Sequence, residues 1–539
     1  MKKFTFYLAI FVGFTLLLSF KNEPQKLPNI VWLNIEDLSP HLNCYGDSTV
    51  PTPNIDRLAK EGILYTNVFC TAGVCAPSRN AIATGRIQTS NGGHNMRTLI
   101  DTYPEKTGLP KEYSVVMPAD VKHFAELLRA KGYYTVNNAK TDYQFYETPT
   151  TWDESSGKAD YMNREPNQPF FAMLNCGITH ESQVWVRANR PLRVSPDKVK
   201  IPPFLPDTDS VRLDYARFYT NISEMDDWVG EQMKKLEDNG LLENTIVMYW
   251  TDHGDGLPFT KREIYDRGLR VPFIVRFPDK RGAGTKNNRL ISSIDWAPTV
   301  LSLAGIPTPT FMQGKAFLGE YSSKSSNQYV FAARDRADSE YDRVRAVTDG
   351  KYQYIYNFFP GKPLYMNVEY RKQQAGMREI LRLKDEGKLN ATQMKWFTPT
   401  KPQEEFYDLK KDPYQLENLA KNPKYENEVN RFKKVFREWQ KSVVDYGAIP
   451  EKDLVKKMWN GMDVPPKTSE PVFLESKGLT SILCSTVGAS VGYKIIENGK
   501  PEPKRWEVYQ NPIKLSENQK IKAVAMRIGY LKSEVAISD

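Results

Sequence analysis

The sequence predicts an α/β protein in which a large, mostly parallel sheet lies between helices. Three continuous apolar runs carry this prediction, and each ends in polar residues: NIVWLNIED (29–37), QPFFAMLNCGITH (168–180) and NTIVMYWTDHG (244–254). An amphipathic stretch, residues 222–242, precedes the last run, and strands that alternate with helices are typical of a layered α/β sheet. Ligands bind beyond the carboxyl ends of strands in such sheets, so the three polar ends indicate one shared crevice.

The order of the predicted elements divides the 539 residues into segments. Residues 1–24 contain two lysines and then an apolar run, which predicts an export signal; an uncleaved anchor helix is the alternative. Residues 25–327 hold the α/β domain, residues 328–465 a smaller α+β subdomain, and residues 471–539 a small β-sandwich. We therefore expect the protein in the periplasm or outside the cell, with membrane contact only through the export signal.

Composition narrows the classes of partner. The formal charge of +9 favours an anionic partner, although an ordinary solvated surface also explains it. We find no nucleic-acid-binding motif and no Gly-rich phosphate loop in the sequence. The five cysteines are too few and too scattered for a disulfide scaffold, no CxxC pair indicates zinc, and at least one cysteine must stay unpaired.

Acidic residues close two of the predicted strands. Glu36 and Asp37 follow the first strand, and Asp252 and His253 follow the third. Acids often only mark a strand end, and that alternative stays open. Together at one sheet edge they would repel one another without a cation, and carboxylate ligands favour Ca²⁺ or Mg²⁺ over zinc.

Cys75 stands directly before APSRNAIATGR (76–86), which predicts a loop entering a helix. Pro77 suits the first turn of this helix, and Arg79 adds positive charge. A thiolate is favoured at a helix N-terminus beside arginine, so Cys75 is a candidate nucleophile. A buried structural cysteine is the alternative.

This segment resembles a family signature. CAPSRNAIATGR (75–86) is similar to the C-x-P-S-R-x-x-x-x-T-G motif of the type I sulfatases, whose cysteine is converted to Cα-formylglycine. Residues 29–47, 52–69, 269–278 and 404–420 also resemble landmarks of this family. Within it, the IED opening and residues 252–268 look most similar to sulfamidases, the heparan N-sulfatases. The resemblance implies an alkaline-phosphatase-like sulfatase core.

The same resemblance implies a metal site and a modified residue. The metal ligands would be Glu36, Asp37, Cys75, Asp252 and His253. The ion would be Ca²⁺ first and Mg²⁺ second; the family usually has Asp and Asn where this chain has Glu36 and His253. A formylglycine-generating maturation enzyme would convert Cys75 to 3-oxoalanine, whose hydrate supplies the nucleophilic hydroxyl, and Arg79 would orient it.

Further positions match the sulfate and leaving-group sites of the family. Lys140 and Lys261 would contact sulfate, and His180 would lie near the leaving group; a surface lysine or a satisfied core histidine is the alternative for each. Asp142 stands where the family has a histidine, and an ordinary aspartate pKa of about 3.9 makes it a weaker base. We expect a hydroxyl to attack sulfur, and His180 or Lys261 to protonate the leaving atom.

The function expected from the resemblance is an exported sulfatase that acts on a sulfated polysaccharide, with the N-sulfoglucosamine of heparan sulfate favoured. The alternatives are an O-sulfatase on a chondroitin or algal glycan, a phosphatase or phosphonate hydrolase of the same superfamily, and a non-catalytic glycan-binding protein. Donors suited to a polyanionic sugar are His94, Arg97, Arg262, Arg334 and Arg345.

Overall fold

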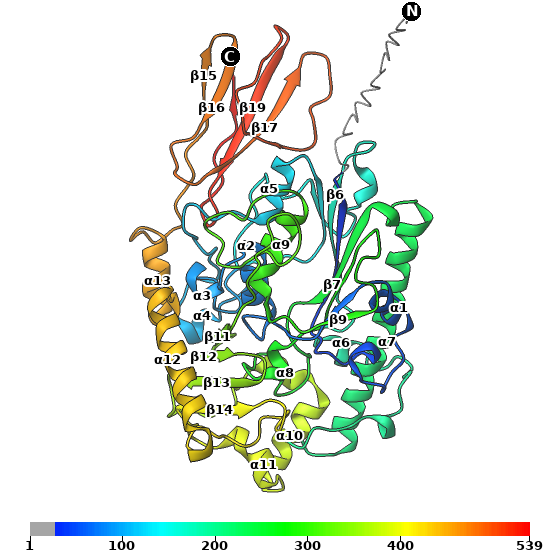
Figure 1. Cartoon of the computed structure of the whole chain (residues 1–539). Helices are drawn as coiled ribbons and strands as arrows, with labels where there is room; N and C mark the ends of the chain where they lie inside the picture. Colours follow the sequence, from blue (N-terminus) through cyan, green and yellow to red (C-terminus); the bar gives the residue numbers. More distant parts are fainter. Residues whose placement is uncertain (1–26, 539) are drawn as a thin grey trace, which may run out of the picture.

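The computed structural model describes residues 27–538, and an eight-stranded mixed sheet forms its centre (Figure 1). The strands follow the order β5-β4-β6-β1-β7-β8-β2-β9. Their bounds are β1 (Asn29–Ile35), β2 (Ile63–Tyr65), β4 (Tyr134–Asn138), β5 (Glu154–Ser155), β6 (Phe170–Cys176), β7 (Thr245–Thr251), β8 (Phe273–Arg276) and β9 (Thr285–Asn287). Only β8 runs antiparallel to its neighbours among these described strands, which confirms the prediction of a mostly parallel sheet.

Helices cover both faces of this sheet because its central strands are apolar on both faces. In β1, Val31 and Leu33 pack into one helical layer, whereas Ile30 and Trp32 pack into the other. The first layer contains α1 (Pro53–Glu61) and α7 (Asp209–Asp238). The second layer contains α2 (Cys75–Thr84), α5 (Phe124–Ala130) and α9 (Trp296–Leu303).

A smaller antiparallel sheet lies beside the core. Its strands are β11 (Val330–Ala337), β12 (Glu340–Thr348), β13 (Tyr352–Asn357) and β14 (Glu404–Asp408). Helix α12 (Glu426–Ser442) packs on this sheet through an aromatic cluster, and α10 (Ala375–Asp385) packs against α7. The remaining elements here and in the core are β3 (Val68–Phe69), β10 (Ile291–Ser292), α3 (Gln88–Asn91), α4 (Pro104–Thr107), α6 (Gln183–Val186), α8 (Asp266–Leu269), α11 (Ala391–Met394) and α13 (Glu451–Met458).

The C-terminal segment forms two small antiparallel sheets. Their strands are β15 (Val472–Ser476), β16 (Leu479–Leu483), β17 (Ser490–Glu497), β18 (Glu507–Val508), β19 (Gln519–Met526) and β20 (Ala536–Ile537). Ile482 and Ile521 belong to the apolar cluster that joins the two sheets. Ser490 Oγ donates to the carboxylate of Glu126 in α5 at 2.7 Å, so this unit is docked onto the core.

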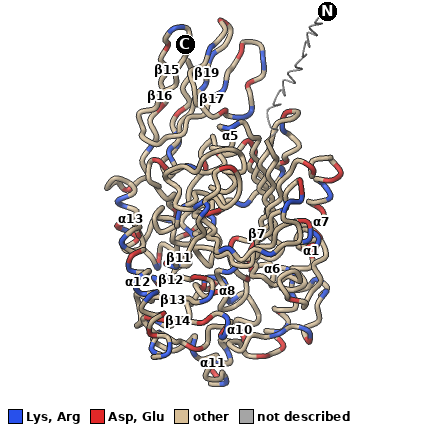
Figure 2. Tube along the Cα trace, in the orientation of Figure 1, with Lys and Arg blue, Asp and Glu red and all other residues tan. Residues whose placement is uncertain are grey.

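The charged residues are spread along the chain, and the cysteines are unpaired. Acidic and basic positions are interleaved along α7, α12 and α13 (Figure 2), so the net positive charge does not come from one block of the chain. All five cysteines lie in the described part of the chain as free thiols. The predicted export signal, residues 1–24, lies outside the described residues. Within residues 27–538, no helix has the length and apolar character needed to cross a membrane.

Candidate active site

The site is assembled at the carboxyl ends of four parallel strands. The segments after these strands contribute Glu36 and Asp37 (β1), Lys140 and Asp142 (β4), His180 and Glu181 (β6), and Asp252 and His253 (β7). These strands are neighbours in the sheet, so residues more than 200 positions apart in the chain lie side by side. The crevice expected from the strand ends is therefore present.

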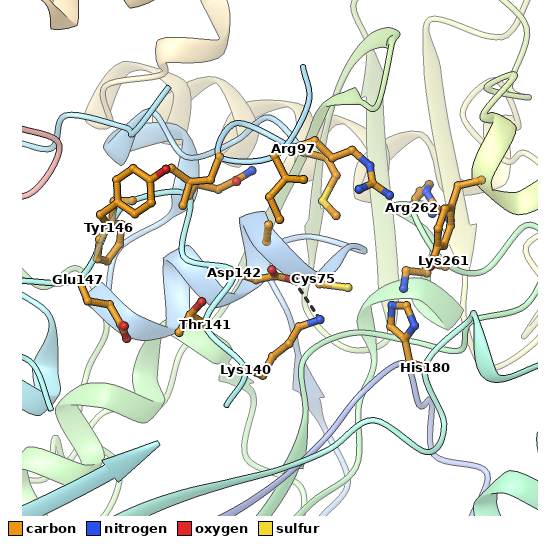
Figure 3. Close-up of a pocket in the computed structure, with 17 residues that line it drawn as sticks. Cys75, Arg97, Lys140, Thr141, Asp142, Tyr146, Glu147, His180, Lys261 and Arg262 are labelled. Atoms are coloured by element: carbon orange, nitrogen blue, oxygen red, sulfur yellow. Dashed lines mark ion pairs between the residues drawn. The ribbon is translucent and has the colours of Figure 1, made fainter. Parts of the chain in front are cut away.

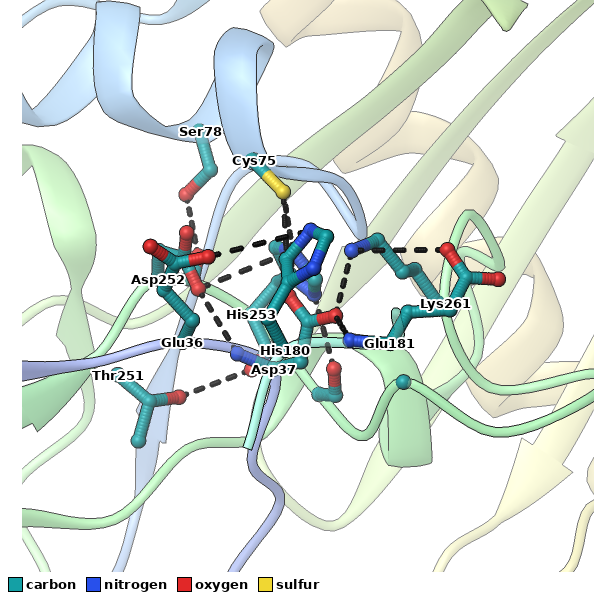
Figure 4. A network of polar contacts seen from close by, with 12 residues as sticks. Glu36, Asp37, Cys75, Ser78, His180, Glu181, Thr251, Asp252, His253 and Lys261 are labelled. Carbon is teal, nitrogen blue, oxygen red and sulfur yellow. Dashed lines mark hydrogen bonds and ion pairs between the residues drawn. The ribbon is translucent and has the colours of Figure 1, made fainter. Parts of the chain in front are cut away.

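Cys75 is the first residue of α2 and faces this crevice from the opposite side (Figure 4). Arg79 lies one turn further along the helix, and both side chains are buried. Arg79 Nε donates to Asp252 Oδ2 at 2.9 Å, and its Nη1 donates to Asn175 Oδ1 at 3.2 Å. The Arg79 Nη2 group is buried without a partner among the described residues, which leaves one donor free for a ligand oxygen.

Four potential ligand atoms converge beside α2. They belong to Asp37, Cys75, Asp252 and His253 and lie within 4.8 Å of one another. His253 Nδ1 lies 2.8 Å from the carbonyl oxygen of Gly254 and donates to it, so Nε2 faces Asp37 Oδ1 at 3.1 Å. Despite burial, Asp252 and Asp37 raise the pKa of this ring in the absence of a cation, and a bound cation would take the place of the Nε2 proton. Two buried carboxylates and one imidazole nitrogen fit a divalent cation, and the oxygen ligands favour Ca²⁺ or Mg²⁺.

Glu36 lies next to this group rather than within it. Its Oε2 is 3.3 Å from Lys140 Nζ and 3.9 Å from His180 Nε2. Glu36, Asp37 and His180 form a second group of potential ligand atoms that shares Asp37 with the first. Glu36 thus connects the four-atom group to the cations of the pocket.

Lys261 and Arg262 reach the same place from the loop between β7 and β8. Lys261 Nζ forms a buried ion pair with Asp37. Arg262 donates both Nη groups to the carboxylate of Glu181, at 2.9 and 2.8 Å. The backbone N–H of Glu181 in turn donates to Asp37 Oδ2 at 2.7 Å. Glu181 therefore fixes both Arg262 and Asp37.

The electrostatic balance of the site favours charged groups despite burial. Burial alone would raise the pKa of the Cys75 thiol, but Lys261 and His253 outweigh it and lower this pKa to about 6. Burial also opposes the charge on Lys261, yet Asp37 holds its pKa above the ordinary lysine value. Burial would raise the pKa of Asp142, but Lys140 and Arg79 lower it. Asp142 is accordingly an even weaker base than an ordinary aspartate.

His180 presents a protonated nitrogen to the site. His180 Nδ1 lies 2.8 Å from Ser182 Oγ, so the charged ring can donate Nδ1–H to this hydroxyl and present Nε2–H to the site. Burial and Lys261 both oppose the charged form of the ring, but Asp37, Cys75 and Glu36 together raise the pKa of His180. This histidine can therefore hold a proton for a leaving group.

A cavity of about 530 Å³ opens above Cys75 (Figure 3). Arg97, Lys261, Arg262 and His180 lie on one side of Cys75, and Tyr146 and Glu147 lie on the other. The complete lining is Cys75, Ala76, Met96, Arg97, Leu99, Ile100, Lys140, Thr141, Asp142, Gln144, Phe145, Tyr146, Glu147, His180, Lys261, Arg262 and Tyr370. The cavity is thus cationic near Cys75 and aromatic at its far side.

The structure separates the predicted substrate contacts into two sets. Arg97 and Arg262 line the pocket, whereas His94, Arg334 and Arg345 do not. Arg345 is fully buried between Asp335 and Asp445, and Arg334 pairs with Glu263 and Asp342. Burial and nearby Arg345 lower the pKa of His94 to about 4. The two arginines are held by buried acids and His94 is buried away from the pocket, so the geometry of the pocket does not favour a contact of these three residues with substrate.

Sequence reasoning missed several residues of the site. Glu181 directly follows the predicted His180, and its position at a strand end was the available signal. Tyr370 enters the pocket from the α+β subdomain, and no motif marks it. Glu147 lines the pocket and accepts a hydrogen bond from Trp152 Nε1; burial raises the pKa of its carboxyl to about 7.

Unusual backbone conformations gather at this site. The φ angles of Asp37 (54°), Arg97 (60°), Asp142 (55°) and Arg262 (72°) all lie in the left-handed region. Residues other than glycine rarely adopt this conformation, and such strain clusters at functional sites. The backbone geometry thus agrees with the convergence of charged side chains.

Comparison with known proteins identifies the family. The sequence model described as Sulfatase matches residues 28–169 and 157–306, more than half of the chain. The chain belongs to the sulfatase family. A second model, described as N-sulphoglucosamine sulphohydrolase, C-terminal, matches residues 254–360 of this sulfatase.

Relatives extend the match over nearly the whole sulfatase. An "Ulvan-active sulfatase" of Formosa agariphila is 44% identical over 95% of this chain and 91% of its own length. The N-sulphoglucosamine sulphohydrolase of Homo sapiens is 22% identical over 76% of this chain and 89% of its own length. The solved structure of a 2-O GAG sulfatase superposes with a TM-score of 0.56 at 19% identity, covering 81% of this chain and 94% of that one. The predicted fold and the predicted enzyme class, a sulfuric ester hydrolase, are confirmed.

Proposed function

We propose that this sulfatase removes sulfate from a sulfated polysaccharide, using a formylglycine at position 75 and a bound Ca²⁺. The observation that carries the proposal is the place of Cys75. It begins α2 within 4.8 Å of ligand atoms from Asp37, Asp252 and His253, at the base of a cationic cavity. An ordinary structural cysteine would not require this convergence of charged groups.

The substrate that we favour is a sulfate ester of an ulvan-type polysaccharide. The relative named for activity on ulvan is twice as similar to this chain as the human N-sulphoglucosamine sulphohydrolase, at 44% against 22% identity. The match to the sulphohydrolase C-terminal model supports a sulfamate as the second candidate. The heparan preference expected from the sequence therefore becomes the alternative.

The residues present fit both groups that the family uses. When matured, residue 75 supplies a hydroxyl nucleophile, and a bound Ca²⁺ supplies positive charge that stabilises developing oxygen anions there. Asp37, Asp252 and His253 would hold the ion, and Glu36 would add negative charge beside it. Mg²⁺ is the second candidate because the carboxylate oxygens suit either ion.

Three cations would bind and orient the sulfate group. Arg79 has the free Nη2 donor, and Lys140 and Lys261 keep raised pKa values because of neighbouring acids. Fixed positive groups around the sulfur position stabilise charge that develops on the sulfate oxygens. Asp142 lies 3.1 Å from Lys140 Nζ, so we propose that it orients this lysine instead of acting as a base.

His180 would protonate the leaving oxygen. The charged ring lines the cavity with its Nε2–H, and Ser182 Oγ fixes its orientation by accepting from Nδ1. Transfer of the Nε2 proton leaves a neutral imidazole. Proton transfer from a positioned histidine contributes roughly 10²- to 10⁴-fold to a rate. Lys261 would remain charged and bind sulfate, because its raised pKa makes it a poor proton donor.

Sulfate release from defined substrates tests the proposal. The full chain is produced together with a formylglycine-generating enzyme and incubated with ulvan, heparan sulfate, chondroitin sulfate and a matched pair of aryl sulfate and aryl phosphate. We expect sulfate from ulvan to be released fastest, and the Asp252→Asn variant to lose this activity. The Arg193→Gln variant changes an exposed ion pair with Asp227 and serves as the control. Faster phosphate than sulfate release would contradict the proposal.

Residues 1–24 are proposed to direct export. Sequencing the N-terminus of the protein recovered from the periplasm or medium tests this, and a cytoplasmic chain that retains Met1 would contradict it. The β unit at residues 471–539 is proposed to be an accessory module, because its contacts with the core lie at α5 and at residues 115–122 and 150–153, and none of its residues lines the cavity.

A further inference from the structure

The cavity wall contains an arginine whose role the sulfate-binding residues leave open. Arg97 lies in the segment after α3, on the same side of Cys75 as Arg262 (Figure 3). Its Nε donates to the buried carboxylate of Asp338, and its Cζ lies 5.2 Å from the ring centroid of Tyr370. One edge of the guanidinium is thus held by the protein and one face rests on an aromatic ring.

The other edge of Arg97 is available. Its side chain is 22% exposed, and neither of its Nη groups donates a hydrogen bond to another residue within the described range 27–538. Arg262 differs, because both of its Nη groups are used by Glu181. Of these two pocket arginines, Arg97 therefore keeps a free pair of donors.

The backbone holds this donor pair in place. Arg97 has a left-handed φ of 60°, which costs an arginine of the order of 1 kcal/mol or more. The neighbouring residues are anchored, since Met96 N donates to Arg336 O at 2.9 Å and Thr98 Oγ1 bonds to Gln144 Oε1 at 3.0 Å. A strained and anchored arginine with a free fork is preorganised for a planar or tetrahedral anion.

We propose that Arg97, supported by Asp338 and Tyr370, binds a second anionic group of the substrate, a carboxylate or a further sulfate, next to the sulfate that is removed. This inference rests on the proposed action on a sulfated polysaccharide. Cys75 already has Lys261 and Arg79 beside it, so the sulfate under attack does not need Arg97. Arg97 is thus a specificity residue that selects polyanionic sugars.

Matched substrates separate the two sources of this anion. The first pair is a sulfated uronate disaccharide and its carboxyl-reduced form, and the second is a disulfated and a monosulfated hexosamine. For Arg97→Gln we expect KM to rise about 10- to 100-fold on the member with the extra anion, with little change in kcat. The other member should be unaffected. Only the first pair responds if the anion is a carboxylate, and only the second if it is a sulfate.

Two further variants complete the design. Arg97→Lys keeps the charge but lacks the paired N–H donors of the guanidinium, so it should recover only part of the affinity. It also provides a second test if Arg97→Gln folds poorly. Arg164→Gln is the control, because Arg164 also stacks on an aromatic ring, that of Phe170, but lies outside the cavity lining. Equal losses by Arg97→Gln on both members of both pairs would overturn the inference.

Binding distinguishes this inference from the proposed function. The same substrate pairs are titrated calorimetrically onto the Cys75→Ala protein and onto the Cys75→Ala, Arg97→Gln protein, where turnover plays no part. A loss of affinity confined to the member with the extra anion supports the role of Arg97 even if the wild-type chain releases no sulfate. An unchanged affinity for that member overturns the inference even if the wild type is an active sulfatase.

Discussion

His253 Nε2 lies 3.2 Å from the sulfur of Cys75, while Nδ1 of the same ring is held by the carbonyl oxygen of Gly254. The imidazole therefore presents its metal-binding nitrogen to the residue that we expect to become the nucleophile. This contact joins the end of β7 to the start of α2, more than 170 residues apart in the chain. The metal group and position 75 thus form one unit.

Removal of the metal should weaken both activity and stability. In the ion-free protein, Asp37 and Asp252 lose the cation that balances them, so chelation should lower the melting temperature and Ca²⁺ should restore it. His253→Asn replaces nitrogen with an oxygen ligand and should keep Ca²⁺ binding while weakening Zn²⁺ binding. Calorimetric titration of Ca²⁺ and of Zn²⁺ onto the wild type and onto His253→Asn measures this change of preference. A chelated wild-type protein with an unchanged melting temperature would argue against the metal site.

Arg79→Gln should destabilise the ion-free protein and abolish sulfate release. The substitution leaves the buried carboxylate of Asp252 without its partner, and breaking a buried ion pair lowers the free energy of unfolding by about 3–5 kcal/mol. Arg276→Gln is the matched control, because Arg276 is equally buried and pairs with Glu61 at 3.0 Å outside the cavity lining. Urea unfolding and sulfate release are measured on both variants. Loss of activity in Arg276→Gln equal to that in Arg79→Gln would remove the special role of Arg79.

His180→Asn should affect poor leaving groups far more than good ones. A sugar alkoxide needs a proton as the S–O bond breaks, so its sulfate ester should lose roughly 10²- to 10⁴-fold in kcat. A nitrophenolate leaves without a proton, so nitrophenyl sulfate should be hydrolysed at nearly the wild-type rate. Equal losses on the two substrates would show that His180 does not act as the proton donor.

Glu147 should make stability depend on pH. Burial raises its pKa to about 7, whereas in the unfolded chain it titrates near an ordinary value of about 4.3. Between these values the folded protein binds the extra proton, so this carboxyl lowers the free energy of unfolding as pH rises from about 4 to 7. The free energy of unfolding, measured with urea, should fall between pH 5 and pH 8. This fall should be about 1–3 kcal/mol smaller in Glu147→Gln than in the wild type. Identical decreases in both proteins would contradict the raised pKa.

Local pattern was sufficient to predict the core sheet and the place of the site. The apolar runs at β1, β6 and β7 required burial on both faces, and parallel strands bring their polar ends to one edge. That is why Asp37 and Asp252 could be placed together before any geometry was known. The start of α2 at Cys75 was predictable in the same way from Pro77 and the helix-forming residues that follow it.

The remaining substrate contacts depended on tertiary pairing, which local sequence does not reveal. Arg345 was predicted to donate to substrate, but it donates to Asp445, which is 100 positions away in the chain. Tyr370 reaches the cavity only because the α+β subdomain packs against the core. A donor in the sequence becomes a binding residue only when the acids of the fold leave some of its N–H groups free, as Asp338 leaves the Nη groups of Arg97.

The most direct test of the account is mass spectrometry of the peptide that contains residue 75, taken from protein whose sulfate release has been measured on the same sample. We predict an aldehyde or its hydrate at position 75, in an amount that rises in proportion to the rate of sulfate release. Cys75→Ser should show neither the modification nor activity when the maturation enzyme recognises only cysteine. A fully active preparation with an unmodified thiol at position 75 would contradict the central claim.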